Sequence, residues 1–227
     1  MEKLKLLAKE NIWNLIKLMK PYEKMTKDNT ALVVIDIVNS CCHEKCETPE
    51  WNISFSKIRE MVPKLDKFIK DFRNKIGGKI IFTNITPWTK ESLPENINNL
   101  YTDPNTTYYG DGSDFENEFY VVKPKEQDII ITKNNYDTFS NPEFDKILKQ
   151  NGVQYIIMTG VFTDGCVLAT IVGGFSHGYN FVILKDLVET TDKKIRQELC
   201  QYLIDYTFPI LYGKTLNSEE FLESWIK

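Results

Sequence analysis

The sequence predicts an α/β protein in three layers, with helices on both faces of a mostly parallel, six-stranded sheet. Short, continuous apolar runs recur along the chain, and segments with helical spacing separate them. Strands buried on both faces of a parallel sheet are continuous apolar runs, and the helices between them supply right-handed crossovers. A chain of 227 residues suits one domain with a substantial core, so we expect a single domain over residues 1–227.

The N-terminal part is expected to begin with an amphipathic helix. Between residues 3 and 19 apolar side chains recur at mostly helical intervals, and the pattern ends before Pro21. We treat residues 1–25 as a helical extension that precedes the core and packs on it or on a second subunit. Residues 31–38 then form a continuous run rich in β-branched residues, which predicts the first buried strand.

A helix and a second strand follow. Residues 62–75 carry apolar side chains at helical spacing, and Gly77 lies just beyond the end of this pattern. Residues 79–85 are the next apolar run. Residues 86–125 have no clear period and are rich in Asn, Asp, Pro, Gly and Tyr. Loops of this length in a compact domain tend to be functional, so we expect this stretch to cover the site.

Three more strands and two helices complete the alternating part of the chain. Residues 128–133 are a short apolar run that ends on a charge, and residues 142–148 have the spacing of a helix. Residues 155–160 and 180–185 predict the fourth and fifth strands. The segment between them, from Cys166 onward, has the spacing of a helix that packs against a sheet.

The C-terminal part is expected to hold two helices and an edge strand. Asp192 is a candidate cap for a helix over residues 195–206. Residues 208–212 are apolar but contain a proline, which a central strand tolerates poorly, so we expect an edge strand there. Asn217 or Ser218 is expected to cap the last helix.

Composition and charge narrow the function classes. The formal net charge is -4 and lysines are spread along the chain, so there is no basic stripe and nucleic acid is not an expected partner. No apolar stretch approaches the roughly 18 residues that a membrane span needs. The first residues lack the apolar core and the cleavage site of a signal peptide, so we expect a cytoplasmic protein without a membrane partner.

The five cysteines are odd in number, and Cys41, Cys42 and Cys46 lie close together in the sequence. A disulfide framework is therefore not expected. A structural zinc site usually needs about four ligands with a second matched pair, and few Cys and His remain outside the cluster. We expect neither a metal nor another cofactor. A redox-sensing role for the clustered thiols stays open.

Charged and nucleophilic side chains fall where the expected strands end. Asp36 ends the first strand, Lys133 ends the third, and Cys166 follows the fourth by one loop. In a parallel sheet the carboxyl ends of the strands lie at one edge, and that edge holds the site. A charged Asp in a buried run is costly unless it is paired. We therefore expect these three side chains to meet.

Together the three side chains can act as one catalytic device. Asp36 can take the thiol proton, and Lys133 can stabilise both the carboxylate and the thiolate. The helix N-terminus at Cys166 is expected to make the thiol more acidic. The thiolate would attack a carbonyl, N–H groups in the loop from Val161 would stabilise the oxyanion, and Asp36 would return the proton to a leaving amine. Taken singly, Cys166 can also be a packing residue and the Asp–Lys pair an inert ion pair.

Three ordered motifs resemble those of a known family. They are Ala31-Leu-Val-Val-Ile-Asp36, Ile131-Thr-Lys133 with Tyr136-Asp-Thr-Phe139, and Thr159-Gly-Val-Phe-Thr-Asp-Gly-Cys166-Val-Leu-Ala-Thr170. Over about residues 30–212 the chain is similar to the isochorismatase-like cysteine hydrolases. These include nicotinamidases, N-carbamoylsarcosine amidohydrolases and ureidoacrylate amidohydrolases.

The resemblance implies both a fold and a set of site residues. The fold is a Rossmann-like sheet, and the catalytic triad maps onto Asp36, Lys133 and Cys166. The implied oxyanion hole consists of the backbone N–H groups of Phe162 and Cys166, with a cis peptide bond between Val161 and Phe162. Members of the family usually form oligomers, so we expect a homo-oligomer.

Departures from the family pattern narrow the substrate. Nicotinamidase-like members carry a metal site of an Asp and two His after the second strand, but residues 83–88 contain no His. True isochorismatases hydrolyse a vinyl ether without depending on the thiol, so the intact triad favours an amide or ureido substrate. Trp88, Phe162 and Tyr136 are the aromatic candidates for contacts with it.

The sequence thus predicts a cysteine hydrolase that cleaves the C–N bond of a small amide or ureido molecule through a thioester on Cys166. Two alternatives from the same family stay open. One is a vinyl ether hydrolase of the isochorismatase type, and the other is a catalytically inactive member that binds a small molecule.

Overall fold

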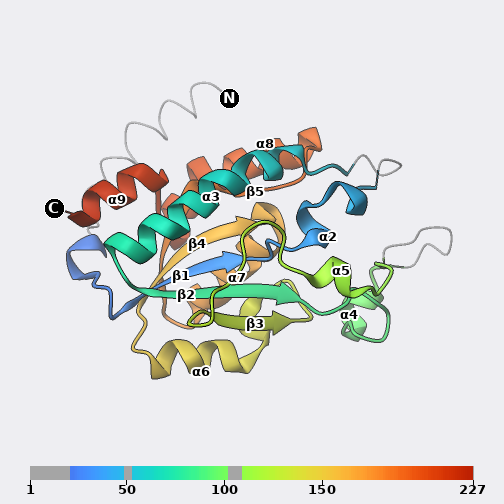
Figure 1. Cartoon of the computed structure of the whole chain (residues 1–227), viewed down its shortest axis with the longest axis horizontal. Coiled ribbons are helices and arrows are strands. Elements are labelled where there is room, and N and C mark those ends of the chain that lie inside the picture. The colour runs from blue at the N-terminus through green and yellow to red at the C-terminus, as the bar shows by residue number, and fades with distance from the viewer. Residues whose placement is uncertain (1–20, 49–52, 102–108, 227) are drawn as a thin grey trace.

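The sheet of the protein has six strands in the order β3-β2-β1-β4-β5-β6 (Figure 1). The computed structural model describes residues 21–48, 53–101 and 109–226. All five pairs of neighbouring strands are parallel, which confirms the expected sheet. The strands are β1 (Thr30–Ile35), β2 (Lys79–Ile85), β3 (Ile129–Lys133), β4 (Tyr155–Val161), β5 (Asn180–Glu189) and β6 (Gly213–Leu216).

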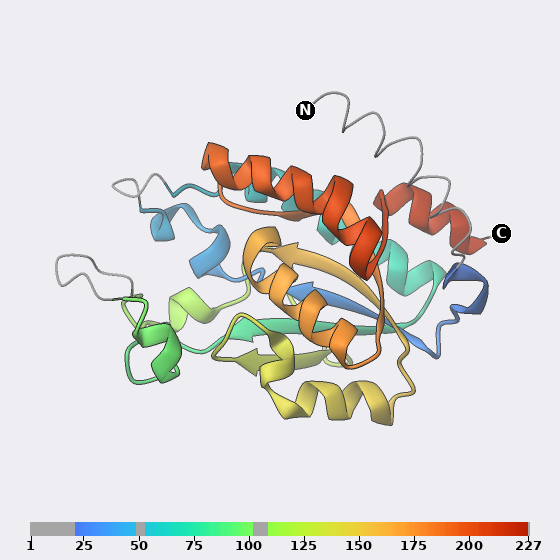
Figure 2. The same cartoon turned by 180° about the vertical axis from the view of Figure 1, so that it is seen from behind.

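Helices cover both faces of this sheet, as Figures 1 and 2 show, and they give the three layers that the sequence predicts. One face packs against α3 (Ser56–Lys75) and α9 (Ser218–Ile226). The opposite face packs against α6 (Pro142–Gln150), α7 (Leu168–Ser176) and α8 (Lys194–Tyr202). Successive residues of β1 belong to the two core clusters in alternation, which is why the whole run is apolar.

The edge strand lies further along the chain than the sequence predicts. Residues 208–212, expected to form it, belong instead to the π-helical segment η6 (Leu203–Tyr212). β6 begins directly after η6 and pairs with β5. The prediction was wrong because a short apolar run has no period that separates a buried helix from a strand. Gly213 is suited to this transition, since a Cβ there would lie 2.2 Å from the carbonyl oxygen of Phe181.

The helical part of the segment between β2 and β3 lies beyond the carboxyl ends of the strands, and the rest of the segment returns across the sheet to the start of β3 (Figure 1). Its described parts contain two short helices, α4 (Glu95–Asn98) and α5 (Asp114–Asn117). α5 packs against α2 (Asn39–Cys42), the short helix that follows β1. This placement agrees with a segment that covers the site. The remaining short turns are η1 (Pro21–Lys24), η2 (Glu44–Cys46), η4 (Thr138–Ser140) and η5 (Thr163–Val167).

The other expected helices are present, with one change at a boundary. α3 begins at Ser56 and therefore extends further toward the N-terminus than residues 62–75. The helix expected over residues 3–19 lies outside the described residues. Among the helices that the structure describes, none has the length and apolar character to cross a bilayer.

Asp192 caps a different helix from the one that the sequence suggests. Its carboxylate accepts hydrogen bonds from the backbone N–H groups of Ser56 and Lys57, both at 3.0 Å, in the first turn of α3. The hydroxyl groups of Ser54 and Ser56 also donate to it. Because the first N–H groups of a helix have no partner within the helix, Asp192 supplies acceptors that α3 lacks. α8 begins at Lys194 without a side-chain cap.

Replacing Asp192 with Ala removes these acceptors, so we expect the free energy of unfolding to fall by about 1 to 2 kcal/mol. Chemical denaturation followed by circular dichroism measures this change. Lys193→Ala is the matched control, because Lys193 is exposed and its side chain makes no capping hydrogen bond. The control is expected to change the same quantity by less than about 0.5 kcal/mol. Equal effects of the two substitutions would contradict the capping role.

Candidate active site

Asp36 lies directly after β1, at the carboxyl edge of the sheet, and it is buried. Its φ of +49° is in the left-handed region that residues other than glycine rarely adopt. Thr83 on the neighbouring strand β2 holds Asp36 at two points. The N–H of Asp36 donates to the Thr83 hydroxyl at 3.0 Å, and this hydroxyl donates to Oδ1 of Asp36 at 2.6 Å. The other carboxylate oxygen, Oδ2, accepts from Lys133.

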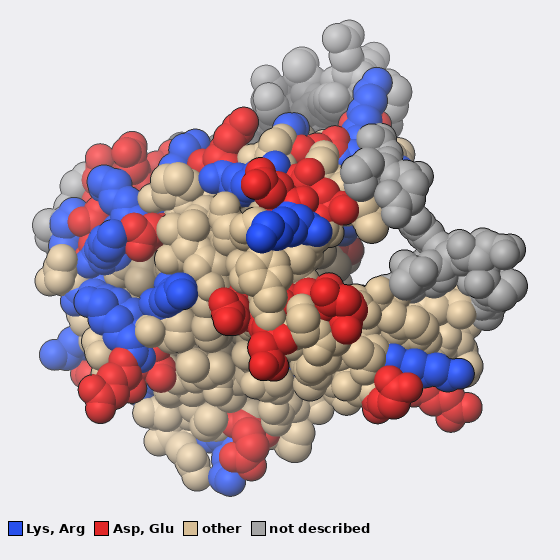
Figure 3. Space-filling view, turned by 45° about the vertical axis from the view of Figure 1, so that its right-hand side comes forward, with Lys and Arg blue, Asp and Glu red and all other residues tan. Residues whose placement is uncertain are grey.

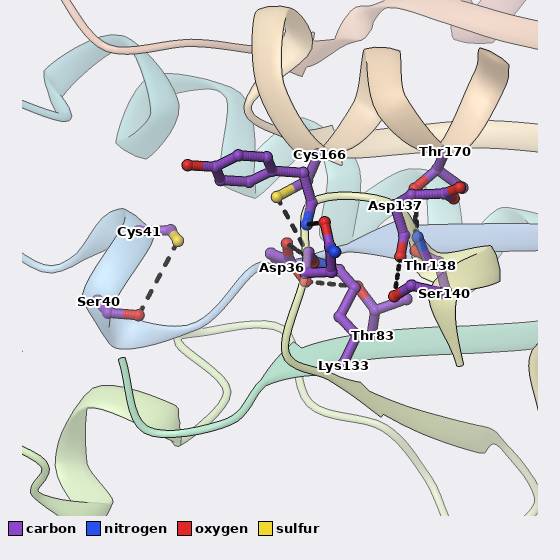
Figure 4. Close-up of polar contacts among 12 residues, drawn as sticks. Asp36, Ser40, Cys41, Thr83, Lys133, Asp137, Thr138, Ser140, Cys166 and Thr170 are labelled. Carbon is purple, nitrogen blue, oxygen red and sulfur yellow. Dashed lines mark hydrogen bonds and ion pairs between the residues drawn. The ribbon is translucent and has the colours of Figure 1, made fainter. Parts of the chain in front are cut away.

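Lys133 ends β3, and its ammonium group connects the acid to the thiol (Figure 4). Nζ donates to Oδ2 of Asp36 at 2.7 Å, to the backbone oxygen of Asn135 at 3.1 Å and to Sγ of Cys166 at 3.3 Å. An ammonium group has three N–H bonds, so these acceptors satisfy it completely. The side chain is fully buried, and its charge therefore depends on these contacts for stabilisation.

Cys166 lies in η5, immediately before α7, and its Sγ points toward Asp36 and Lys133 (Figure 4). The structure thus brings together the three side chains that the sequence places at or after the ends of strands. All three are buried within one network of hydrogen bonds. The parallel sheet is the cause, because it turns the ends of β1, β3 and β4 to the same edge.

The thiol of Cys166 is less acidic than its position before a helix suggests. Burial and the negative charge of Asp36 raise the pKa of Cys166 to about 12, although Lys133 acts in the opposite direction. Burial alone would lower the pKa of Lys133, but Asp36 and Cys166 raise it above its ordinary value. The expectation of an acidic thiol is therefore wrong. At neutral pH the site holds a neutral thiol beside an ion pair.

The loop between β4 and Cys166 contains the expected cis peptide bond. This bond joins Val161 and Phe162, which confirms the expectation. The carbonyl oxygen of Phe162 accepts hydrogen bonds from the N–H groups of Gly165 and Val167, at 2.9 and 3.1 Å. These two bonds fix the turn that leads to the thiol.

Arg196, on α8, holds the same loop by contacting the side chains of two loop residues, Asp164 and Phe162. Its Nε and Nη2 donate to the carboxylate of Asp164, both at 2.6 Å, and the Thr190 hydroxyl donates to this carboxylate at 2.6 Å. Burial acts the other way, but these donors hold the pKa of Asp164 below its usual range. The guanidinium carbon also lies 5.0 Å from the centroid of the Phe162 ring. That ring stacks on Phe55 at a centroid distance of 6.0 Å.

A cavity of about 730 Å³ opens beside Cys166. Its lining includes all three aromatic residues that the sequence offers as substrate contacts, Trp88, Tyr136 and Phe162. The rings of Trp88 and Tyr136 stack with centroids 5.9 Å apart. Nε1 of Trp88 donates to the Tyr101 hydroxyl at 2.9 Å, which fixes the orientation of the indole. The thiol therefore has both a base nearby and room for a small molecule.

The cysteine cluster is close to this site but lacks the properties of a redox sensor. Cys41 and Cys46 line the cavity, and Cys42 is fully buried. Burial raises the pKa of each of the three thiols above its ordinary value. Sensor cysteines need thiolate character, so the redox interpretation gains no support. In the described part of the chain, His, Cys, Asp and Glu side chains form no group of three that could hold a metal ion.

Sequence reasoning missed three residues of this site. Thr83 holds Asp36, Arg196 holds the loop before the thiol, and Glu116 lines the cavity. Thr83, a polar residue directly after the apolar run of residues 80–82, was a usable signal. Arg196 and Glu116 gave none, because their roles depend on residues that only the folded chain brings near.

Comparison with known families identifies the class of protein. A family model described as the isochorismatase domain matches residues 30–211, which is most of the chain. With the three-layer fold, this match defines an isochorismatase domain of the α/β type. The chain belongs to the isochorismatase family, in agreement with its sequence motifs.

Curated relatives share part of the chain. Ureidoacrylate amidohydrolase RutB of Yersinia enterocolitica is 33% identical over 87 residues, which cover 38% of each protein. The protein of the same name from Pantoea ananatis is 28% identical over 135 residues, covering 58% of this chain and 51% of that protein. The chain thus matches between two fifths and about half of the length of these relatives.

Solved structures share the fold over nearly the whole chain. A cysteine hydrolase from Pseudomonas syringae pv. phaseolicola 1448A has a TM-score of 0.73 and 20% identity, covering 88% of this chain and 93% of that one. N-carbamoylsarcosine amidase from Thermoplasma acidophilum has a TM-score of 0.61 and 21% identity, covering 86% of this chain and 98% of that one. At these identities the likeness establishes the fold.

The direction of the Cys166 pKa shift predicts how this thiol reacts with iodoacetamide. Asp36→Asn removes a negative charge that raises the pKa of Cys166, so we expect a larger thiolate fraction and faster alkylation near neutral pH. In the wild type the rate is expected to rise about tenfold per pH unit, because neutral pH lies far below this pKa. Mass spectrometry of labelled peptides measures both rates.

Cys200 serves as the internal control for this measurement. It is buried and does not line the cavity, so its alkylation rate is expected to be the same in the wild type and in Asp36→Asn. Slower alkylation of Cys166 in the variant would show that Asp36 does not raise the pKa of this thiol.

Proposed function

We propose that this protein hydrolyses the C–N bond of a small amide or ureido molecule through a thioester on Cys166. One observation carries the proposal: Nζ of Lys133 lies 2.7 Å from the Asp36 carboxylate and 3.3 Å from the Cys166 sulfur, beside an open cavity. The ureidoacrylate amidohydrolases and the N-carbamoylsarcosine amidase among the matched proteins support a C–N bond as the target.

The first proposed step makes the nucleophile. The Asp36 carboxylate takes the proton from Cys166 Sγ while the sulfur attacks the carbonyl carbon, so that the free thiolate does not accumulate. Lys133 keeps its charge throughout, because its raised pKa holds the proton on Nζ at neutral pH. Its contact with Sγ stabilises the negative charge that the sulfur gains on the way to the transition state.

The following steps release the amine and restore the enzyme. The backbone N–H groups of Phe162 and Cys166 stabilise the oxyanion that forms when the C=O bond becomes single. The protonated Asp36 gives its proton to the leaving nitrogen, the C–N bond breaks, and the thioester remains. Water then attacks the thioester with Asp36 as the base, and the sulfur leaves with a proton from Asp36. Each cycle uses one water and returns the thiol.

This mechanism predicts that the protein releases ammonia from at least one member of a panel of small amides and ureides. A coupled enzymatic assay measures the ammonia. Cys166→Ala is expected to lower kcat by roughly a thousandfold or more, because it removes the nucleophile. Cys200→Ala is the matched control, since Cys200 is also a buried thiol but does not line the cavity. The control is expected to keep the wild-type kcat.

Two outcomes would decide against this function. Turnover of a vinyl ether that survives Cys166→Ala, with no ammonia release from the panel, would exclude the thioester and favour the vinyl ether hydrolase. Binding of small molecules without turnover of any of them would favour the inactive member of the family.

Arg196 gives a second test, because it holds the loop that supplies the proposed oxyanion donors. Arg196→Gln is expected to lower kcat by roughly tenfold to a hundredfold while the rate of Cys166 alkylation stays unchanged. Alkylation by iodoacetamide forms no oxyanion, so it reports on the thiol alone. Steady-state kinetics and labelling of the same samples measure the two effects.

Lys194→Gln is the control for Arg196→Gln, since Lys194 lies on the same helix, is almost fully exposed and does not contact the loop. It is expected to change neither rate. Loss of both hydrolysis and alkylation in Arg196→Gln would mean that the residue supports the whole site and has no separate role in positioning the oxyanion donors.

A further inference from the structure

The charged groups on the wall of the cavity do not balance. Four charged side chains line it: Asp36, Glu116, Asp164 and Arg196. Asp36 is neutralised by Lys133, and Asp164 is neutralised by Arg196. Within the described residues, Glu116 forms no ion pair. The cavity therefore has one negative charge without a counter-ion on its wall.

Lys45 directly precedes the lining residue Cys46, and its Nζ lies 5.6 Å from the centroid of the Phe115 ring, but it forms no ion pair with Glu116. Residues 49–52 follow the lining residue Thr48, and residues 102–108 precede the lining residue Tyr109. Both stretches lack Lys, Arg and His, and each contains one acidic residue.

Glu116 is fixed at one end of the cavity. Its Oε1 accepts from the backbone N–H of Asp111 at 3.2 Å, and a Cβ on Gly110 would lie 2.2 Å from its Oε2, so the carboxylate packs directly over this glycine. Burial raises the pKa of the Cys46 thiol to about 11, and the negative charges of Glu116 and Asp111 act in the same direction. Both carboxylates therefore act on this end of the cavity.

Aromatic rings line the same space. Trp88, Tyr109 and Tyr136 contribute to the wall of the cavity. Trp88 and Tyr109 precede Glu116 in the segment between β2 and β3, and Tyr136 follows β3 in the sequence. The face of an aromatic ring attracts an organic cation within about 6 Å of its centroid. A carboxylate among such rings suits an ammonium group and repels another carboxylate. Figure 3 shows the hollow from outside, with both acidic and basic side chains on the surface beside it.

Arg196 does not offer a competing site for an anionic substrate. Its Nε and Nη2 are occupied by Asp164, and the face of its guanidinium group covers Phe162. Its remaining Nη1 lies 3.4 Å from the Thr191 hydroxyl. The one cation among the described lining residues is thus committed to the loop.

We infer that this cavity selects substrates that carry an organic cation, an ammonium or substituted ammonium group, at the end remote from the bond that is cleaved. Glu116 is the residue that determines this specificity. The inference rests on the proposed function for the nature of the cleaved bond, whereas the charge preference is a property of the cavity wall. Binding and turnover therefore test the two separately.

The test compares three primary amides of equal chain length that end in an ammonium group, a methyl group or a carboxylate. Calorimetry measures their binding to the Cys166→Ala protein, which cannot form a thioester, and kcat/KM is measured on the wild type. The ammonium amide is expected to bind roughly tenfold more tightly than the carboxylate amide. Adding Glu116→Gln is expected to weaken binding of the ammonium amide roughly fivefold and to strengthen binding of the carboxylate amide.

Glu118→Gln is the matched control, because Glu118 lies two residues further on, is exposed and does not line the cavity. It makes the same change in net charge and is expected to leave the binding order and affinities unchanged. Thermal melting checks that both variants are folded.

The possible outcomes separate the inference from the proposed function. Tighter binding of the carboxylate amide, no measurable binding of the ammonium amide, or equal effects of the Glu116 and Glu118 substitutions would overturn the charge preference. A preference for the ammonium amide in binding, without turnover by the wild type, would support the charge preference and overturn the hydrolase function.

Discussion

The ion pair between Asp36 and Lys133 is the interaction on which the rest of the site depends. Both side chains are buried, and removing one partner of such a pair costs about 3 to 5 kcal/mol because a charge is left uncompensated. The pair connects the ends of β1 and β3, which are not neighbours in the sheet. Thr83, on the strand between them, bonds to Asp36 and completes the connection. Three adjacent strand ends thus form one rigid support for the sulfur.

Asp36 and Lys133 also affect the protonation state of the Cys166 thiol, the proposed nucleophile. Lys133 contacts the sulfur and favours the thiolate, but burial and the carboxylate outweigh it and keep the proton on Cys166. A thiolate at rest would face the Asp36 carboxylate in a site with little water, so the charge is better formed when a substrate carbonyl receives it. A neutral thiol is also the form that oxidants attack slowly. The geometry thus holds a neutral thiol and the proposed base, Asp36, in one buried network.

The sequence predicts much of the fold because the relevant signals are local. Continuous apolar runs mark strands β1 to β5, and the direction of a parallel sheet places Asp36, Lys133 and Cys166 at one edge before any contact is known. The errors involve tertiary partners. The sequence suggests Asp192 as the cap of the helix that follows it. In the structure its carboxylate instead accepts hydrogen bonds from the first turn of α3, which is far away in the sequence. The prediction of a lowered pKa for Cys166 was also wrong. The sequence indicates the start of a helix at Cys166, but it does not reveal the burial that raises the pKa of this thiol.

Catalysis and selectivity come from different parts of this chain. The proposed catalytic side chains come from the ends of strands, where sheet hydrogen bonds and two core clusters fix the backbone. The carboxylate of Glu116 and two of the rings on the cavity wall, those of Trp88 and Tyr109, come from the segment between β2 and β3, which contains only short helices in its described parts. Such a segment can change its side chains without moving the strand ends. One fold could therefore keep the proposed chemistry and admit substrates of different charge, and the proposed preference of this cavity for a cation rests on Glu116, which has no ion-pair partner among the described residues.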